Sequence, residues 1–149
     1  MQQPLRRKQL LTLPVLIALI ILTACGGAAP TNRTVAPDAA AVDLSALPDL
    51  VDATTVNAIR ERSEVFLLDV REQSEYDEGH IPGVTLIPSG SVASRLSEIP
   101  HDKTVIVSCR SGNRSSQVVA FLRQQGYTNI HDLQGGILAW QQAGLPVEQ

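Results

Sequence analysis

Cys109 stands between a run of apolar residues, 104–108, and a short polar loop that opens an amphipathic helix. A thiol at the carboxyl end of a buried strand and the amino end of a helix faces unpaired backbone N–H groups and the positive end of the helix dipole. Arginines in the loop add positive charge. These features favour the thiolate, so the position predicts a nucleophilic cysteine. The loop and the start of the helix consist of Arg110, Ser111, Gly112, Asn113, Arg114 and Ser115.

The length of this loop indicates the size of the group that it binds. Small and flexible residues let successive amides turn toward one anionic atom, as in other backbone anion nests. Four residues separate Cys109 from Arg114, whereas tyrosine-phosphatase-like loops have five and hold a tetrahedral phosphate. The shorter loop is better suited to the terminal sulfur of a persulfide.

With its flanking motifs, this loop resembles the rhodanese family of sulfurtransferases. The resemblance extends from about residue 50 to about residue 146, and Val84 is a minor departure where the family more often has alanine. The residues that carry it, besides 109–115, are Leu68-Asp69-Val70-Arg71, Glu75-Tyr76, Gly79-His80-Ile81-Pro82-Gly83-Val84, Ile87-Pro88, Gly126-Tyr127, Leu133-Gln134-Gly135-Gly136 and Ala139-Trp140.

The resemblance implies a reaction in which Cys109 takes sulfur from a small anionic donor such as thiosulfate and passes it to cyanide or a thiol. A protein can serve as the sulfur acceptor or as the reductant, and no cofactor is expected. We expect residues 110–115 to bind the substrate, with Arg110 attracting the donor and Arg114 bracing the loop. Asp69 and Arg71 resemble the family's structural pair near the site. His80 is a base by type, but its position between glycine and proline favours a structural role.

Two other classes of function stay open. One is a phosphatase or arsenate-reductase-like enzyme, which the short loop opposes. The other is a membrane-tethered binding or sulfur-carrier module whose persulfide is loaded and read by partner proteins. A metal site is not expected. His80, His101 and His131 lack the spacing of metal ligands, and Cys109 is already assigned the role of nucleophile.

The order of apolar runs and helical patterns predicts an α/β fold. The resemblance specifies a three-layer rhodanese-like domain with a central parallel sheet of about five strands and helices on both faces. Continuous apolar runs suit strands buried on both faces. Expected strands are 65–68, 84–87, 104–108 and 129–133, and expected helices are 54–62, a short one within 71–78, 91–99, one ending at Gly126, and 136–142.

The amino-terminal residues predict export. Arg6-Arg7-Lys8 precede an apolar run of thirteen residues, 10–22, which is shorter than a membrane-spanning helix and fits a signal peptide. The run ends in Leu22-Thr23-Ala24-Cys25-Gly26, which resembles the bacterial lipoprotein box. We therefore expect a signal peptide over 1–24, a lipidated Cys25 with an Ala/Pro-rich tether over 25–47, and the domain over 48–149. The protein would lie outside the cytoplasm, anchored to the cell membrane, or to an outer membrane where one exists.

The charge balance argues against a nucleic-acid partner. Without its first eight residues the chain has nine basic and fifteen acidic residues. It therefore offers no basic stripe that would displace counterions from phosphates.

Overall fold

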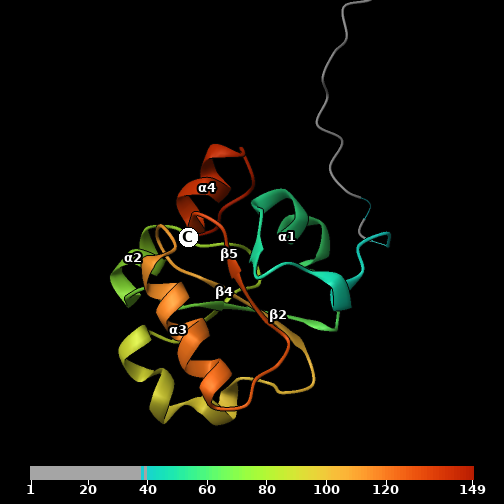
Figure 1. Ribbon diagram of the computed structural model, residues 1–149. Helices are drawn as coiled ribbons and strands as arrows, with labels where there is room; N and C mark the ends of the chain where they lie inside the picture. Colours follow the sequence, from blue (N-terminus) through green and yellow to red (C-terminus); the bar gives the residue numbers. More distant parts are fainter. Residues whose placement is uncertain (1–37, 39) are drawn as a thin grey trace, which may run out of the picture. The chain divides into compact units, whose positions relative to one another are not determined.

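The computed structural model describes residue 38 and residues 40–149, which contain a five-stranded parallel sheet. The strand order is β1-β5-β4-β2-β3, so β4 is central and is flanked by β5 and β2 (Figure 1). The predicted α/β fold is confirmed. The strands are β1 (Leu50–Val51), β2 (Val65–Asp69), β3 (Thr85–Leu86), β4 (Thr104–Ser108) and β5 (Ile130–Leu133).

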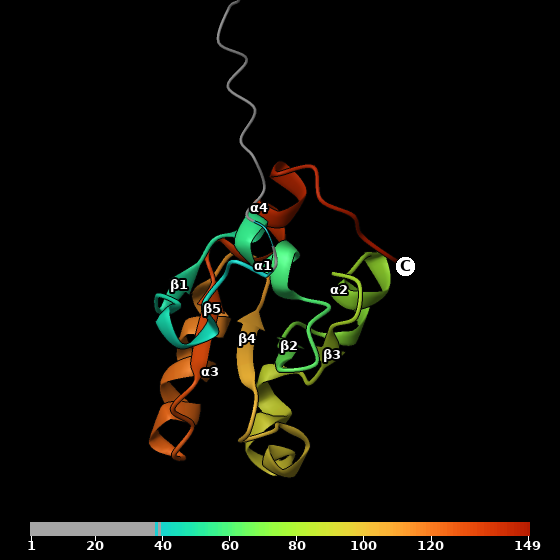
Figure 2. The ribbon, with the colours of Figure 1, turned by 90° about the vertical axis from the view of Figure 1, so that its right-hand side faces the viewer.

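Helices cover both faces of the sheet, as the two turned views show (Figures 1 and 2). One face packs against α3 (Asn113–Gln124) and the 3-10 helices η2 (Ser89–Ser94) and η3 (Leu96–Glu98). The other packs against α1 (Ala53–Ile59) and α4 (Gly136–Gln142). The short α2 (Gln73–Glu78) follows β2. The chain therefore forms the three layers that buried parallel strands require.

Side chains of the central strands alternate between the two cores. In β4, Val105 and Val107 join the core under α3, and Ile106 joins the core under α1 and α4. All five residues of β4 are buried, which explains the continuous apolar run in the sequence. Because the strands are parallel, their carboxyl ends meet at one edge, where Asp69 of β2 pairs in register with Ser108 of β4.

One expected element differs from the structure, and one strand of the structure was not expected. The helix expected over 91–99 is wrong in type, because that region holds η2 and η3, separated at Arg95 with φ −118°. Serine and glycine have low helix propensity, so η2 has little local preference for an α-helix. The strand β1 was not among the expected strands, because two residues are too short to give a periodic signal.

The folded part begins before residue 48. Val42, Leu44 and Leu47 pack against the core beneath α1 and α4, and Asp43 caps the 3-10 helix η1 (Leu44–Ala46). The end of the predicted tether therefore belongs to the domain. Cys25 and the predicted signal peptide lie outside the described residues. In residues 38 and 40–149, no helix is long and apolar enough to cross a membrane.

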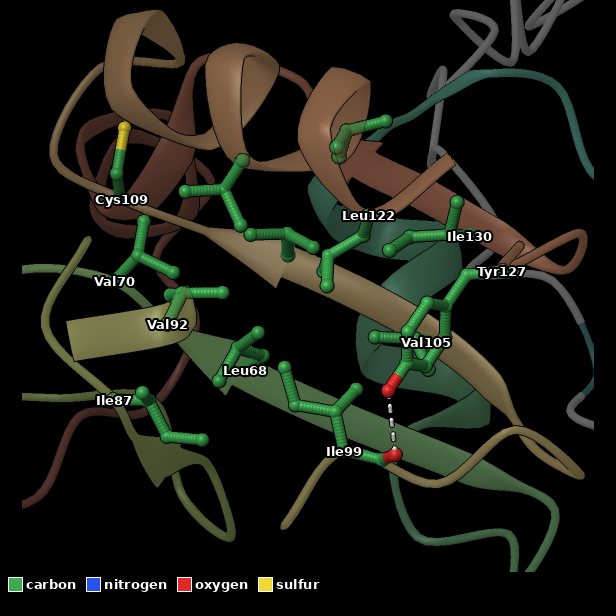
Figure 3. Packing of buried hydrophobic residues seen from close by; sticks show 13 residues of the cluster. Leu68, Val70, Ile87, Val92, Ile99, Val105, Cys109, Leu122, Tyr127 and Ile130 are labelled. Carbon is green, nitrogen blue, oxygen red and sulfur yellow. Dashed lines mark hydrogen bonds between the residues drawn. The ribbon is translucent and has the colours of Figure 1, made fainter. Parts of the chain in front are cut away.

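Tyr127 connects the core under α3 to the segment that precedes β4 (Figure 3). Its hydroxyl lies 3.0 Å from the carbonyl oxygens of both Leu96 and Ile99. Burial raises the pKa of Tyr127. This hydrogen bond fixes η3 against the end of α3.

Replacing Tyr127 with phenylalanine is expected to lower the free energy of unfolding by about 1–2 kcal/mol, because a buried carbonyl then loses its donor. Denaturant unfolding measures the change. Tyr76→Phe is the matched control, since the Tyr76 ring stacks on His80 and its hydroxyl forms no hydrogen bond with any residue that the structure describes. Equal losses in the two variants would contradict the role of the Tyr127 hydroxyl.

Candidate active site

Cys109 follows the last residue of β4 and lies at the end of the buried core, with its sulfur directed toward α3 (Figure 3). The residue is 1% exposed. The chain turns at Gly112, whose φ of 101° lies in the left-handed region, and α3 begins at Asn113. Glycine adopts this conformation without the steric cost that other residues meet. The sharp turn brings the first amides of α3 back toward the sulfur.

Hydrogen bonds to the sulfur favour the thiolate of Cys109. The Gly112 N–H lies 3.1 Å from Sγ, and the Ser115 hydroxyl lies 3.4 Å from it. Burial opposes ionisation and is the largest single effect. Hydrogen bonds from the Ser115 hydroxyl and from the backbone of Ser115, Gly112 and Ser111 together outweigh it, so the pKa of Cys109 lies below its ordinary value.

The amino terminus of α4 holds the loop from its outer side. The Ile137 N–H donates to the Cys109 carbonyl over 2.9 Å, and the Leu138 N–H donates to the Arg110 carbonyl over 3.2 Å. Gly136 makes this approach possible, because a Cβ there would lie 2.3 Å from the Cys109 carbonyl oxygen and 2.8 Å from the Arg110 carbonyl carbon. With these carbonyls turned outward to α4, the loop amides are free to face the sulfur.

Arg114 is held by Glu75 of α2. Its two terminal nitrogens lie 2.6 and 2.7 Å from the two carboxylate oxygens, which is a bidentate pair. The Arg114 hydrogen bonds lower the pKa of Glu75 to about 2, and those to Glu75 raise the pKa of Arg114. The pair ties α2 to the first turn of α3.

Asp69 and Arg71 form a buried ion pair at the end of β2. Arg71 is 4% exposed, and its Nη2 lies 2.7 Å from the Asp69 carboxylate. The remaining guanidinium hydrogens reach the carbonyls of Glu75 and Gly79, each over 2.9 Å. The two hydrogen bonds that Arg71 makes outside the pair go to Glu75 in α2 and to Gly79 at its carboxyl end, so the pair positions α2 and thereby Glu75.

A polar cleft of about 240 Å³ lies beside the loop, between α2 and α4. Arg110 is exposed on its wall and, among the described residues, forms no ion pair. Its position suits the attraction of an anion from solvent. The cleft is lined by Arg71, Glu75, Glu78, Gly79, Arg110, Ile137, Leu138 and Gln141.

Comparison with known proteins identifies the domain. The pattern of the rhodanese-like domain matches residues 52–143. The chain belongs to the rhodanese family. A sulfurtransferase of Allochromatium vinosum is 43% identical over 89 residues, which cover 60% of this chain and 83% of that protein. The crystal structure of a rhodanese-related protein from Thermoplasma volcanium is 34% identical, with a TM-score of 0.61, over 68% of this chain and 98% of that one.

A further relative is a Bacillus subtilis protein, YrkF, whose name describes a sulfur carrier. It is 30% identical over 96 residues, which cover 64% of this chain and 52% of that protein, so this chain matches only about half of its length. These relatives place the rhodanese-like domain among sulfurtransferases and sulfur carriers.

Of the predicted loop residues, Ser111, Gly112 and Ser115 hydrogen-bond to the Cys109 sulfur, whereas Arg114 pairs with Glu75 and Arg110 lines the cleft. The substrate-binding role of residues 110–115 stays a prediction. His80 lies apart from the sulfur's hydrogen bonds: its Nδ1 lies 3.2 Å from the Tyr76 carbonyl and its ring stacks on Tyr76. The backbone of His80 pairs with Glu148 near the carboxyl terminus, which runs beside α2 (Figure 2). Within residues 38 and 40–149, no three His, Cys, Asp or Glu side chains are grouped to hold a metal ion.

Three residues around the site had no role in the sequence-based prediction. Glu75 and Gly136 stand inside motifs that carry the family resemblance, and only the folded structure shows what they contact. Asp132 is a buried acid in β5. The signal for Asp132 was present in the sequence, since a carboxyl group in the short strand 130–133 is unusual for a buried position.

Replacing Gly136 with alanine is expected to displace the loop and weaken the thiolate. The new Cβ would collide with the carbonyls of Cys109 and Arg110, so the amides would move away from the sulfur and the pKa of Cys109 would rise. The pH dependence of Cys109 alkylation by iodoacetamide measures this change.

Gly144→Ala is the matched control for this variant. Gly144 has a φ of 69°, close to the 60° of Gly136, but its Cβ would meet nothing within 4 Å. Both variants lose about 1–2 kcal/mol through the left-handed backbone. If Gly144→Ala raised the pKa of Cys109 as much as Gly136→Ala, steric displacement of the loop would be excluded as the cause.

Replacing Glu75 with glutamine is expected to flatten the pH dependence of stability in acid. The folded-state pKa of Glu75 is about 2, below the value of about 4.3 for a free glutamate. Ionised Glu75 thus stabilises the fold above the higher value, and this contribution is lost as the pH falls toward 2. Unfolding free energies of the native protein should therefore fall more steeply between pH 5 and pH 2 than those of Glu75→Gln.

Glu61→Gln is the control for the loss of one glutamate. Glu61 pairs with Arg60 at the surface, where its side chain is 77% exposed, and exposed pairs contribute little to stability. The role of Glu75 would be contradicted by parallel pH curves for Glu75→Gln and the native protein.

Proposed function

We propose that the protein is a sulfurtransferase that carries sulfane sulfur as a persulfide on Cys109, with thiosulfate or a similar anion as donor. The observation that carries the proposal is the pair of hydrogen bonds to the Cys109 sulfur, one from Gly112 in the loop of four residues and one from Ser115 in the first turn of α3. These donors are in place before charge arrives, which is the arrangement that stabilises an anionic intermediate. The exported lipoprotein setting expected from the first 25 residues stays part of this proposal.

The reaction consists of two displacements. In the first, the Cys109 thiolate attacks the outer sulfur of thiosulfate. A new S–S bond forms, the S–S bond of thiosulfate breaks, and its electron pair leaves with sulfite. In the second, cyanide or a thiolate attacks the outer sulfur of the Cys109 persulfide, and the Cys109 thiolate leaves. Charge and electrons balance in each step, and a covalent intermediate of this kind gives ping-pong kinetics.

Around this reaction the residues have separate roles. Arg110 is exposed on the polar cleft and draws the anionic donor toward the loop. Arg114 is neutralised by Glu75 and acts mainly as a brace. The loop amides and the Ser115 hydroxyl stabilise the negative sulfur before and after transfer. No proton donor is needed, because thiolates and sulfite leave as anions.

The full-length protein incubated with thiosulfate is expected to gain one sulfur atom on the peptide that contains Cys109, and to form thiocyanate when cyanide is added. Mass spectrometry of that peptide and a colorimetric thiocyanate assay measure the two steps. Cys109→Ala should abolish both. Cys25→Ser is the matched control, since it removes the other cysteine of the chain and should leave both steps intact.

The proposal would be contradicted if the protein gained no sulfur and formed no thiocyanate. Hydrolysis of a phenyl phosphate by the same protein would then indicate a phosphatase.

A sulfur-carrier role is the second candidate, favoured by the similarity to YrkF and by the near-complete burial of Cys109. A carrier would hold a stable persulfide that cyanide and small thiols discharge slowly. An enzyme would discharge it on each turnover. Single-turnover decay of the isolated persulfide in the presence of cyanide therefore separates the two.

A further inference from the structure

Asp132 is a buried carboxyl group without a full set of partners. It is 4% exposed and lies in β5, in register with Val107 of β4 and Leu50 of β1. Among the described residues, its Oδ1 is the only buried side-chain nitrogen or oxygen atom that lacks a hydrogen-bond partner. Leaving a buried carboxyl group in this state is costly, and more so when it is ionised.

Ser115 connects Asp132 to the sulfur. It is completely buried in the first turn of α3, and its Oγ lies 3.4 Å from Cys109 Sγ and 3.1 Å from the Gly112 carbonyl. The Ser115 hydroxyl also lies next to the Asp132 carboxyl, where it opposes the rise in pKa that burial causes. A hydroxyl has one hydrogen, so the sulfur, the carbonyl and the carboxyl compete for it.

We propose that Asp132 is a positioning residue whose protonation state decides whether Ser115 donates its hydrogen bond to the Cys109 sulfur. When the carboxyl is protonated, its own O–H donates to Ser115 Oγ and leaves the Ser115 hydrogen for the thiolate. When it is ionised, the carboxylate draws the Ser115 hydrogen to itself. The thiolate then loses a donor and gains a negative neighbour.

Burial favours the protonated state of Asp132. Burial raises the pKa of Asp132, and the hydrogen bond from Ser115 opposes this only in part. A buried carboxyl group and a thiolate that share one hydroxyl titrate as a coupled pair.

The other charged groups near Asp132 are already engaged. On α3, which packs against β5, Arg114 pairs with Glu75 and Arg123 pairs with Asp49. Toward β1, the Asp49 carbonyl accepts the Asp132 N–H. The neighbouring His131 points to the opposite face of the strand, where its Nδ1 lies 2.8 Å from the Pro48 carbonyl. Cys109, at the end of β4, is therefore the titratable group that shares a hydrogen-bond donor with Asp132.

Asp132→Asn in the full-length protein tests the proposal, because the amide has nearly the same shape and cannot ionise. We expect the pKa of Cys109 to fall, with about threefold to tenfold more thiolate below that pKa. The pH dependence of iodoacetamide alkylation, followed on the Cys109 peptide to exclude Cys25, measures the change. Asp102→Asn removes an exposed carboxylate as the matched control and should leave the profile unchanged.

Ser115→Ala shows whether the effect passes through the hydroxyl. This variant is expected to raise the pKa of Cys109, and adding Asp132→Asn to it should change the profile much less than in the native background. An unchanged profile in Asp132→Asn overturns the proposal. The proposal is also overturned if Asp132→Asn shifts the pKa of Cys109 equally in the native protein and in Ser115→Ala.

The native protein provides a second measurement that does not depend on folding of the variants. Infrared spectroscopy detects the C=O stretch of a protonated buried carboxyl group, and its disappearance with rising pH gives a midpoint. Alkylation of Cys109 removes the thiolate, so the midpoint should move to lower pH. The proposal is contradicted if the midpoint is unchanged by alkylation, or if no such band is present at pH values above those at which aspartate normally ionises.

This inference rests on the proposed role of Cys109 as the nucleophile, but its failure is distinguishable. Alkylation needs no sulfur donor, so a normal response to Asp132→Asn without any persulfide would count against the sulfurtransferase proposal alone.

Discussion

The geometry of the site depends on the hydrogen bonds between the amino terminus of α4 and the carbonyls of the cysteine loop. Ile137 and Leu138 use N–H groups that the first turn of a helix leaves unpaired. Because these N–H groups donate to the carbonyls of Cys109 and Arg110, the free donors of α4 and the carbonyls of the loop both gain hydrogen-bond partners. These hydrogen bonds also fix the orientation of the loop peptide groups, so that the following amides point toward the sulfur. The residue that permits the contact is Gly136, since any side chain would occupy the place of the Cys109 carbonyl.

A second constraint is that most charges around the sulfur are paired. Arg71 is matched by Asp69 and Arg114 by Glu75, so the arginines near the loop serve largely to position α2 and α3. The thiolate is stabilised mainly by neutral hydrogen-bond donors, which are the loop amides and the Ser115 hydroxyl. Such donors lower the pKa of the thiol without forming a tight ion pair with it. The sulfur therefore remains free to attack, which a contact with a bare cation would hinder.

Local patterns were sufficient to predict the central elements. The apolar run that became β4 and the turn at Gly112 are contained in a few neighbouring residues, and the loop and the following helix were predicted there. The regions that were missed depend on distant partners. β1 has two residues and exists because it pairs with β5. Arg114 and Glu75 are 39 positions apart, and no spacing rule connects them. η2 and η3 lack a strong helical preference and are held by contacts such as that of Tyr127.

The arrangement of the site also explains why a buried acid is tolerated in β5. An apolar residue at position 132 would avoid the cost of an unpaired carboxyl group, but it could not donate a hydrogen bond to Ser115 Oγ. A protonated Asp132 adds a donor behind Ser115 and polarises its hydroxyl toward the sulfur.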